Sequence, residues 1–402
     1  MHPGFVDWAL AGLSQASYWQ MALVFAIAAQ LTMMSTTLFL HRSATHRGVD
    51  LHPAVAHFLR FWNWLTTAMV TKEWVAIHRK HHARCETAED PHSPRFAGIN
   101  KVLWQGVELY QQAARDPGLL EKYGKGTPDD WVERRVYGHR LGRNLGIAIL
   151  FVANVTLFGL PGVAMWALQM ALMPFSAAGV INGLGHWWGY RNFDTADTAT
   201  NLTPWGLLIG GEELHNNHHA FPSSAKFALR KFEFDLGWAV LWILQKLGLA
   251  RVLRVAPHLD LRPNIAVPDA ETLKAIMAHR WQVATDYFST VLKPQLKAAV
   301  TSEGRKLRLP RRLRRALRSD GRWLDPARRE RMQGYIAARP QLVQLMEFRA
   351  RLLAIYEIRS ADAAVRMDAL KAWCAEAEAS GVRALEEFSM RLKGYALVPA
   401  RA

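Results

Sequence analysis

The chain has few cysteines: among its 402 residues only Cys85 and Cys374 occur. They lie far apart, on segments that we place in the cytosol, so we expect no structural disulfide. The first 17 residues contain no basic stretch followed by a cleavage-site pattern, so we expect no secretory signal there. We expect the first apolar segment to direct its own insertion into a membrane.

Charge is missing from two long stretches. Residues 18–40 contain no charged side chain, and neither do residues 144–185, which are divided near Leu160-Pro161-Gly162. Crossing a bilayer core takes roughly 20 apolar residues. We therefore predict three spans, at about 18–40, 144–160 and 163–185. A buried helix of a soluble protein is the alternative, and the lengths of these stretches disfavour it.

A weaker apolar stretch, residues 54–71, contains Arg60 and Asn63. An arginine at the bilayer centre costs roughly 2.5–3.5 kcal/mol on insertion scales, whereas a helix lying in the interface avoids that cost. We therefore predict an interfacial helix. This placement also leaves the histidines on both sides of the stretch at the same membrane face.

The positive charge is concentrated near the C-terminus. Residues 251–402 hold 29 Lys and Arg against 16 Asp and Glu, which is +13 of the net charge of +16. The densest run extends from Arg305 to Arg315. Basic clusters near spans usually lie on the cytoplasmic side and attract anionic headgroups. Nucleic-acid binding is the competing interpretation, but no known nucleic-acid motif accompanies the run.

Three parts follow from these patterns. We predict an N-terminal tail at 1–17, a membrane domain at 18–255 and a basic helical extension at 256–402, with a linker near Pro257–Pro268. The extension is rich in Ala, Leu, Arg and Glu, which favour helices. The predicted fold class is all-α: a multi-pass membrane protein with a cytosolic helical cap.

Eight of the 16 histidines fall into three tight clusters. Two of the clusters repeat the pattern H-x-x-H-H, and the third is a pair five residues apart. On an α-helix, positions i, i+3 and i+4 share a face, so each H-x-x-H-H set can point one way. The pair does not share a helical face, but a turn of the chain where the first span ends would bring both rings inward. The clusters are His41 and His46; His78, His81 and His82; and His215, His218 and His219.

A ninth candidate, His186, ends the third predicted span, and Asn182 lies one turn before it. A lone histidine there is commonly a satisfied interfacial residue. The topology favours a functional role, because the hairpin of spans returns His186 to the level of the other clusters. All the clusters then lie on one membrane face.

Eight or nine imidazoles exceed what one metal ion can use, which favours two ions. Structural zinc prefers sites that contain cysteine, and catalytic zinc takes about three protein ligands. Imidazole also suits iron, and two irons would keep positions open for O2. A histidine-rich metal-buffering loop is the alternative, but such loops are usually of low complexity, and these clusters lie in non-repetitive sequence.

The three boxes resemble those of the integral-membrane fatty-acid desaturases. The order HRSATHR, EWVAIHRKHH and GEELHNNHHAFP is similar to the stearoyl-type Δ9 branch, as are CETAEDPHS after the second box and NGLGHWWGYR before the third. The resemblance covers roughly residues 20–255. It implies that nine histidines are iron ligands and that Asn182 contacts iron through water. The implied ligands are His41, His46, His78, His81, His82, His186, His215, His218 and His219.

The resemblance also implies cytosolic helices over a membrane stem, with an apolar tunnel that places the acyl chain beside the irons. Two departures matter. Animal acyl-CoA desaturases carry an Arg-Asp pair where this chain has Ala76-Ile77, and an expected Arg-Lys pair has no clear match in Leu109–Arg115. One clear span precedes the first box, where the animal enzymes have two. The sequence therefore looks more like bacterial desaturases that act on acyl chains of membrane lipids.

The predicted function is an O2-dependent desaturase that introduces a cis double bond, at Δ9 by resemblance, into a long saturated acyl chain of a membrane lipid or an acyl-CoA. Side chains alone cannot oxidise an unactivated methylene, so a metal must supply the oxidant. Electrons would come from a separate ferredoxin, rubredoxin-like or cytochrome b5-type carrier with its reductase. The predicted location is an integral membrane, the inner membrane if the source is bacterial, with the active site on the cytoplasmic face. The alternatives are a di-iron hydroxylase and, from another class, a membrane metal transporter.

Overall fold

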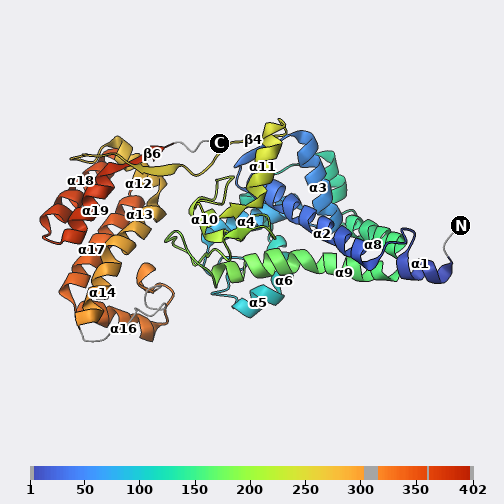
Figure 1. Ribbon diagram of the computed structural model, residues 1–402, viewed down its shortest axis with the longest axis horizontal. Helices are drawn as coiled ribbons and strands as arrows, with labels where there is room; N and C mark the ends of the chain where they lie inside the picture. The colour runs from blue at the N-terminus through green and yellow to red at the C-terminus, as the bar shows by residue number, and fades with distance from the viewer. Residues whose placement is uncertain (1–3, 303–315, 360–361, 399–402) are drawn as a thin grey trace. The chain divides into compact units, whose positions relative to one another are not determined.

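The computed structural model describes residues 4–302, 316–359 and 362–398. The basic run from Arg305 to Arg315 lies outside these ranges. The described chain is mostly helical, as predicted, with a few short paired strands. It divides into two compact units, one containing residues 4–191 and 197–256 and the other containing residues 192–196 and those from 257 onward. Each unit is described by itself (Figure 1).

The first unit holds the apolar helices and the histidine clusters. Two short sheets complete it: β1 pairs antiparallel with β4, and β2 pairs parallel with β3. Its elements are α1 (Phe5–Ala11), α2 (Tyr18–Ser35), the π-helix η1 (Thr36–Thr45), β1 (Val49–Leu51), α3 (Pro53–Thr67), α4 (Thr71–Arg84), α5 (Ile99–Trp104), α6 (Gly106–Ala114), α7 (Pro117–Tyr123), the π-helix η2 (Glu133–Tyr137), α8 (Leu145–Phe158), α9 (Leu160–Met173), the π-helix η3 (Pro174–Ile181), the 3-10 helix η4 (Leu184–His186), β2 (Trp205–Gly206), α10 (His215–Ala220), β3 (Phe234–Asp235), α11 (Leu236–Lys246) and β4 (Ala250–Val252).

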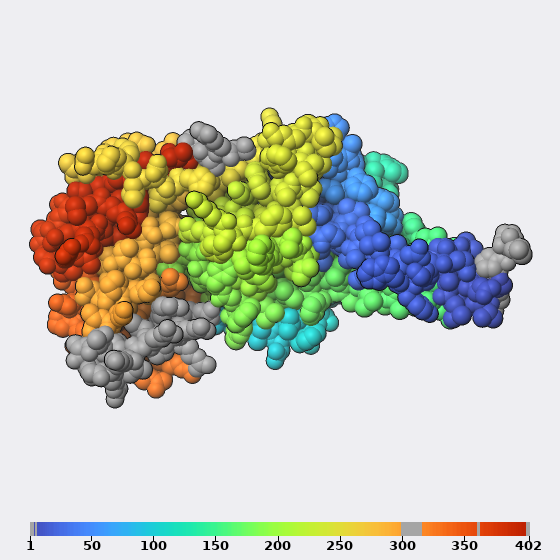
Figure 2. Space-filling model, in the orientation of Figure 1, coloured from blue at the N-terminus to red at the C-terminus, as the bar shows by residue number. Residues whose placement is uncertain are grey.

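Two helices are long and apolar enough to cross a membrane. They are Tyr18–Thr45, with 28 residues, and Leu160–His186, with 27 residues; Leu145–Phe158 is a shorter apolar helix. Figure 2 shows residues near the N-terminus, in blue, beside green residues of the hairpin formed by α8 and α9. Side chains such as Ile27, Val152 and Leu168 are exposed on these helices, as expected of surfaces that face lipid. The multi-pass topology stays a prediction.

Local sequence fixes where these helices begin and turn. Ser17 caps α2 by accepting a hydrogen bond from the backbone N–H of Gln20 at 3.4 Å. The hairpin turns at Gly159, just before the predicted Leu160-Pro161-Gly162, and its φ of +68° is a conformation that glycine adopts readily. A Cβ on Gly159 would also lie only 2.4 Å from the carbonyl oxygen of Trp8, so α1 packs directly over this turn.

Helix α3 corresponds to the predicted interfacial stretch, and its arginine is not in water. Arg60 is buried and forms two hydrogen bonds to Asp130, at 2.7 and 2.8 Å. Glu133 lies 3.5 Å from the same guanidinium. Paired carboxylates reduce the cost of burying an arginine. The position of α3 in the interface stays a prediction.

A buried arginine ties the first histidine box to the third. Arg42 has its guanidinium between Asp235 and two backbone carbonyls, with Nη2–Oδ1 and Nη1–Oδ2 distances to Asp235 of 2.8 and 3.1 Å. The carbonyl oxygens of Ala225 and Gly210 accept from it at 2.7 and 2.9 Å. Asp235 also caps α11 through the N–H of Trp238. Breaking such a buried pair typically costs about 3–5 kcal/mol, so this contact holds η1 firmly in place.

The second unit has a hydrophobic core of its own, which includes Tyr287, Leu345, Trp373 and Phe388. The predicted linker is partly a strand: β5 pairs antiparallel with β6, because the backbone of His258 to Leu261 finds a partner near the C-terminus. Its elements are β5 (His258–Leu261), α12 (Ala270–Ala278), α13 (Arg280–Tyr287), the π-helix η5 (Phe288–Leu292), α14 (Lys293–Ser302), α16 (Pro326–Ala337), α17 (Pro340–Ala354), the 3-10 helix η6 (Ile355–Glu357), α18 (Ala363–Ala379), α19 (Arg383–Gly394) and β6 (Tyr395–Val398).

Candidate metal centre

His41 lies on a π-helix, and His46 is the residue at its C-terminal cap. We predicted a turn where the span ends, but the helix continues as η1 to Thr45. The N–H of His46 donates to the carbonyl oxygen of His41 at 3.1 Å, which is the i to i+5 bond of this wider helix. Residues five apart therefore lie on the same side. Arg79 holds the end of η1 by donating to the carbonyl oxygens of Ala44 and Thr45, at 2.8 and 3.1 Å.

The two H-x-x-H-H clusters lie on α4 and at the start of α10. We predicted that the three rings of each cluster point one way. They do face a common region, but each cluster divides its rings between two groups. His81 separates from the pair formed by His78 and His82, and His218 separates from the pair formed by His215 and His219. In both helices, the residues at i and i+4 stay together and the ring at i+3 joins the other group.

All nine histidines singled out from the sequence gather in two neighbouring groups. Within a group, the candidate ligand atoms all lie within 4.8 Å of one another. His186, the weakest candidate on spacing alone, is completely buried within the second group. The first group is His41, His46, His78, His82 and His218, and the second group is His81, His186, His215 and His219.

Ring nitrogens within each group converge at short distances. Imidazole Nε2 atoms that face each other this closely are well placed to share a cation. The Nε2–Nε2 distances are 3.0 Å for His41 and His218, 2.9 Å for His82 and His218, 3.1 Å for His78 and His82, and 2.9 Å for His186 and His215.

Two further ring nitrogens support this interpretation. Nε2 of His46 and Nε2 of His219 are buried and have no hydrogen-bond partner among the described residues. Leaving a buried polar atom without a partner is costly, so native structures rarely do it. A metal ion in each group would satisfy both atoms. The donor set present therefore fits two imidazole-bound ions.

Four carboxylates hold rings from behind through Nδ1. They fix which nitrogen faces the group centre and make each imidazole a better ligand. Sequence reasoning assigned no role to these four residues, although three of them lie within motifs that carried the family resemblance. The pairs are His41 with Glu212 at 2.6 Å, His81 with Asp90 at 2.9 Å, His186 with Glu86 at 3.1 Å and His219 with Asp197 at 3.0 Å.

Burial sets the protonation state of most of these rings. It is the main reason why the pKa values of His78, His82, His215 and His218 lie well below the ordinary 6.5, with neighbouring rings lowering them further. Burial also lowers the pKa of His219 to about 4, against the opposing charge of Asp197. These rings are therefore neutral at physiological pH, which is the state that binds metal.

His81 behaves differently. Burial lowers its pKa, but the charge and hydrogen bond of Asp90 outweigh that effect, so the pKa is raised overall. Burial raises the pKa of Asp90, and the contact with His81 outweighs it, so that carboxyl has a lowered pKa and stays ionised. Nδ1 of the ring therefore faces Asp90, and the ring gives up its second proton less readily than the other rings do.

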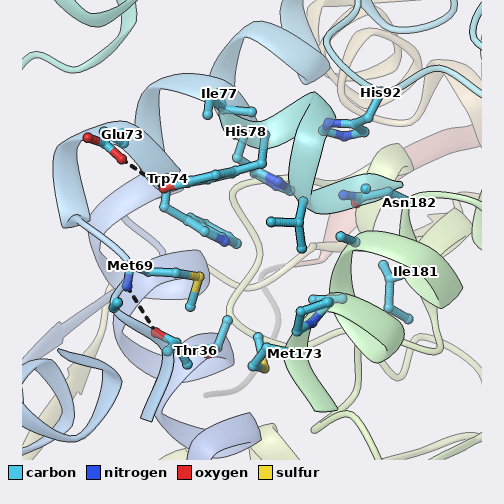
Figure 3. A pocket seen from close by; sticks show the side chains of 18 of the residues that line it. Thr36, Met69, Glu73, Trp74, Ile77, His78, His92, Met173, Ile181 and Asn182 are labelled. Carbon is cyan, nitrogen blue, oxygen red and sulfur yellow. Dashed lines mark hydrogen bonds between the residues drawn. The ribbon is translucent and has the colours of Figure 1, made fainter. Parts of the chain in front are cut away.

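A cavity of about 530 Å³ adjoins both histidine groups. His41 and His78 of the first group line it, and so does His215 of the second. Figure 3 shows Trp74, His78 and Asn182 around this space, with Met173 and Ile181 on the η3 side. Trp74 stacks on His78, with ring centroids 4.9 Å apart and an interplanar angle of 11°. Asn182 thus lines the cavity beside the candidate metal centre without belonging to either group, and its predicted water-mediated contact with iron stays a prediction.

One part of the cavity wall is charged. Arg143 forms a double contact with Glu73, with Nη2–Oε2 and Nη1–Oε1 distances of 3.0 and 3.3 Å. Tyr110 donates to the same carboxylate at 3.5 Å, and burial holds its pKa well above the ordinary range. Met33 and Val107 belong to the apolar part of the wall. The cavity therefore combines an apolar lining with one polar wall.

Comparison with known proteins gives a consistent result. The family model described as "Fatty acid desaturase" matches residues 17–239. The chain is 29% identical over 252 residues to an acyl-CoA C20 Delta5-desaturase of Anemone leveillei, which covers 62% of this chain and 77% of that protein. It is 31% identical over 220 residues to Delta-9 acyl-lipid desaturase 1 of Arabidopsis thaliana, covering 54% and 70%. It is 28% identical over 260 residues to the sn-1 stearoyl-lipid 9-desaturase of Anabaena variabilis, covering 63% and 87%. The chain belongs to the fatty acid desaturase family and is an oxidoreductase.

Proposed function

We propose that this protein is a di-iron, O2-dependent desaturase that forms a cis double bond, at Δ9, in long saturated acyl chains of membrane lipids. The observation that carries the proposal is the gathering of nine imidazoles, seven of them buried and two partly buried, into two groups beside one cavity. Removing hydrogen from two adjacent methylenes, with O2, two electrons and two protons, yields the alkene and two waters. Nothing in the side-chain inventory can supply that oxidising power without a metal.

Iron suits this donor set. The first group would hold one ion and the second group the other, and when bound they would supply the O2-activating redox chemistry. The protein itself keeps His78, His82, His215, His218 and His219 neutral by burial. It also orients four of the nine rings through Glu86, Asp90, Asp197 and Glu212.

The cavity would hold the acyl chain. Ligand sites of 300–1,000 Å³ with a mainly apolar lining and a few placed polar groups are the common form of small-molecule pockets. Met33, Met173 and Ile181 offer such a lining next to the histidine groups. Holding the chain there excludes water from the reacting carbons. Placement also determines the double-bond position, because a shift of about 1 Å can cost 100-fold in rate.

The polar wall would receive the ester end. Glu73 and His78 are five residues apart on α4, which separates their Cα atoms by about 7.5 Å along the helix axis. A headgroup near Glu73 and Arg143 therefore leaves several methylenes before the chain reaches the histidines. This spacing supports a double bond within the chain rather than near the carbonyl.

Membrane lipids are the preferred substrates because a charged pair is missing. Ala76 and Ile77 occupy the positions of the CoA-binding Arg-Asp pair of animal enzymes, and both are buried against Leu119. These positions therefore offer no charge for a CoA headgroup. Among the relatives, three are described as acting on acyl-CoA and four as lipid desaturases, so their names do not decide between the two substrates.

The proposed setting is an integral membrane, multi-pass, with the histidine groups at the cytoplasmic face, and the inner membrane if the source is bacterial. Electrons would come from a separate ferredoxin, rubredoxin-like or cytochrome b5-type carrier with its reductase. The two candidate spans and the family membership support the membrane location.

Expression in a host that lacks its own desaturase tests the proposal. Iron-supplied cells that express the protein should accumulate cis-unsaturated acyl chains in their membrane lipids. His218→Ala should remove the product, while the control His139→Ala, at an exposed position outside both groups, should keep it.

Other products would identify the alternatives. An alcohol in place of the alkene would indicate a hydroxylase. Metal uptake without O2 consumption would indicate a transporter. An iron-loaded protein that leaves the lipids unchanged would contradict the proposal.

A further inference from the structure

A short loop of the family-matched region belongs to the second unit. Residues 192–196 follow η4 and lie within the stretch 17–239 that the family model matches. In the structure, however, they group with the residues from 257 onward. Phe193, Asp194 and Thr195 are buried. Loops usually run over the surface, because buried backbone groups need hydrogen-bond partners. Specific contacts must therefore hold this loop.

Three residues of the second unit hold the loop. The backbone N–H of Asp194 donates to Thr285 Oγ1 at 2.8 Å. The Asp194 carboxylate, whose side chain is 2% exposed, lies 3.4 Å from Nε of Arg318. Arg322 donates to the carbonyl oxygen of Ala196 at 2.9 Å. A buried carboxylate is costly without a cation beside it, so this set of contacts is specific. The second unit therefore sets the position of the loop.

The residues that follow the loop support the second histidine group. Asp197 accepts a hydrogen bond from Nδ1 of His219 at 3.0 Å. The hydroxyl of Thr198 donates to Glu86, and the same carboxylate lies 3.1 Å from Nδ1 of His186. His186 and His219 are two of the four rings in that group. Half of the second group therefore depends on the positions of residues 197 and 198.

Chain continuity links the loop to these supports. Ala196 and Asp197 are neighbours in the sequence, so their Cα atoms are about 3.8 Å apart. From the other side, Arg191 donates to the carbonyl oxygens of Asp197 and Ala199, at 2.9 Å in each case. Side chains that support a site must hold their geometry to within about 0.5 Å. Anchors on both sides of Asp197 therefore restrict the movement of its carboxylate.

We propose that the C-terminal helical extension positions the second metal site, by holding the loop before Asp197 through Thr285, Arg318 and Arg322. This inference rests on the proposed function and gives the extension a part in it. The three residues belong to neither histidine group, so they are positioning residues. Losing one of these anchors should loosen Asp197 and weaken metal binding in the second group alone. An extension with an unrelated role would leave the metal site indifferent to these anchors.

The test uses variants of the full-length protein. Thr285→Val nearly keeps the shape of the side chain and removes the hydroxyl that accepts from Asp194, whereas Thr285→Ser keeps that hydroxyl. Arg322→Gln removes the guanidinium at an exposed position. Thr290→Val and Arg328→Gln are matched controls in the same unit, because both side chains are exposed and bond elsewhere.

The measured quantity is the iron(II) affinity of each site. Competition with a calibrated chelator gives the affinities, and Mössbauer spectroscopy of iron-57 separates the two sites without substrate or turnover. Thr285→Val and Arg322→Gln should each lower the affinity of the second group by about 3–10-fold, since loosening a support costs less than the 10–100-fold of losing it. The first group should keep its affinity, and Thr285→Ser and both controls should match wild type.

Two results would each overturn the inference: an unchanged second-site affinity in both variants, or an equal loss of affinity from both groups. A melting curve of each metal-free variant shows whether it folds. If Thr285→Val does not fold, Arg322→Gln decides alone, because its side chain is exposed. Failure of the proposed function would look different, because wild type itself would then hold no iron or form no alkene.

Discussion

At the scale of single residues, four carboxylates are as important to the candidate metal centre as the histidines, because each binds Nδ1 of one candidate ligand. Asp197 is mostly buried, accepts from His219 Nδ1 at 3.0 Å, and stays ionised because its contact with that ring lowers its pKa against the effect of burial. Partners of this kind orient a ligand and raise its basicity, and their loss typically weakens metal binding 10–100-fold.

Asp197→Asn should therefore weaken iron binding by about 10–100-fold without unfolding the protein. The amide keeps the size of the side chain but removes the charge. Competition with a calibrated chelator measures the affinity. Asp129→Asn, at an exposed residue that pairs only with exposed Arg134 among the described contacts, is the control. Equal affinities for Asp197→Asn and wild type would refute this role.

Arg143 lies on the polar wall, where it pairs with Glu73. If the ester end of the substrate docks there, Arg143→Gln should raise KM about tenfold and leave kcat nearly unchanged, because a charge-assisted hydrogen bond contributes about 1.5–3 kcal/mol. The measurement is steady-state turnover with a defined saturated lipid. Arg140→Gln, at an exposed position outside the cavity lining, is the control, and an equal effect of both variants would place the headgroup elsewhere.

Residue types and spacing predicted the histidines but not their supports. The two H-x-x-H-H sets can be recognised from their helical spacing. His186 can be recognised from its position at the end of a predicted span. Glu86, Asp90 and Asp197 lie in irregular segments, and Glu212 lies just before α10. No periodicity relates these carboxylates to the rings that they bind. The position of His92 beside the histidine groups could not be predicted either, because a single histidine belongs to no spacing pattern.

At the scale of elements, the π-helix η1 determines whether His41 and His46 can both belong to the first group. Its wider turn puts His41 and His46 on one side, and Arg79 fixes its end. The sequence could not predict the π-helix. A spacing of five residues shows that the two histidines do not share a face of an α-helix, but it does not show which backbone conformation brings them together. Spacing alone also led to the prediction that the three rings of each H-x-x-H-H set point one way. In the structure, the ring at i+3 joins the other group.

One alanine inserted between Ser43 and Ala44 should rotate His46 away from His41 by roughly a quarter of a turn of this wider helix. We expect the first group to lose its metal while the second keeps its own, which halves the iron content. The same insertion between Pro263 and Asn264, in a loop of the second unit, is the control. Full iron content in the first variant would show that the register of η1 is unimportant.

At the scale of the whole molecule, burying so many titratable rings makes stability depend on pH. In the folded chain, the pKa values of five rings are lowered, and in the unfolded chain they return to the ordinary value near 6.5. Below that pH the unfolded chain therefore binds more protons than the folded chain does. The five rings are His78, His82, His215, His218 and His219. Stability therefore falls as the pH drops below about 6.5 and continues to fall toward 4. His81 has the opposite sign, but it is one ring against seven, because the pKa values of His46 and His92 are lowered by burial as well.

The metal-free protein in detergent should accordingly melt at a lower temperature at pH 5 than at pH 7. Circular dichroism melts at matched ionic strength measure the difference. Added iron should raise the melting temperature at pH 7, because ligand binding stabilises the folded state. A metal-free protein whose melting temperature is constant or rises on acidification would show that these rings are not buried and neutral.

Composition and apolar run lengths were enough for the helical class and for two long apolar helices. They were less informative about packing. The middle helix of the predicted three, Leu145–Phe158, is shorter than a typical span, and Arg60 is buried through Asp130, a partner 70 positions away. Such long-range pairs leave no local pattern in a single sequence.

The iron content of the purified protein, resolved by Mössbauer spectroscopy after loading with iron-57, tests the central claim most directly. Nine imidazoles in two groups should hold two irons per chain, in two distinguishable nitrogen-rich sites. His46→Ala should lower the signal of one site, and His215→Ala should lower that of the other. One iron per chain, or none in a folded and iron-supplied protein, would contradict the account.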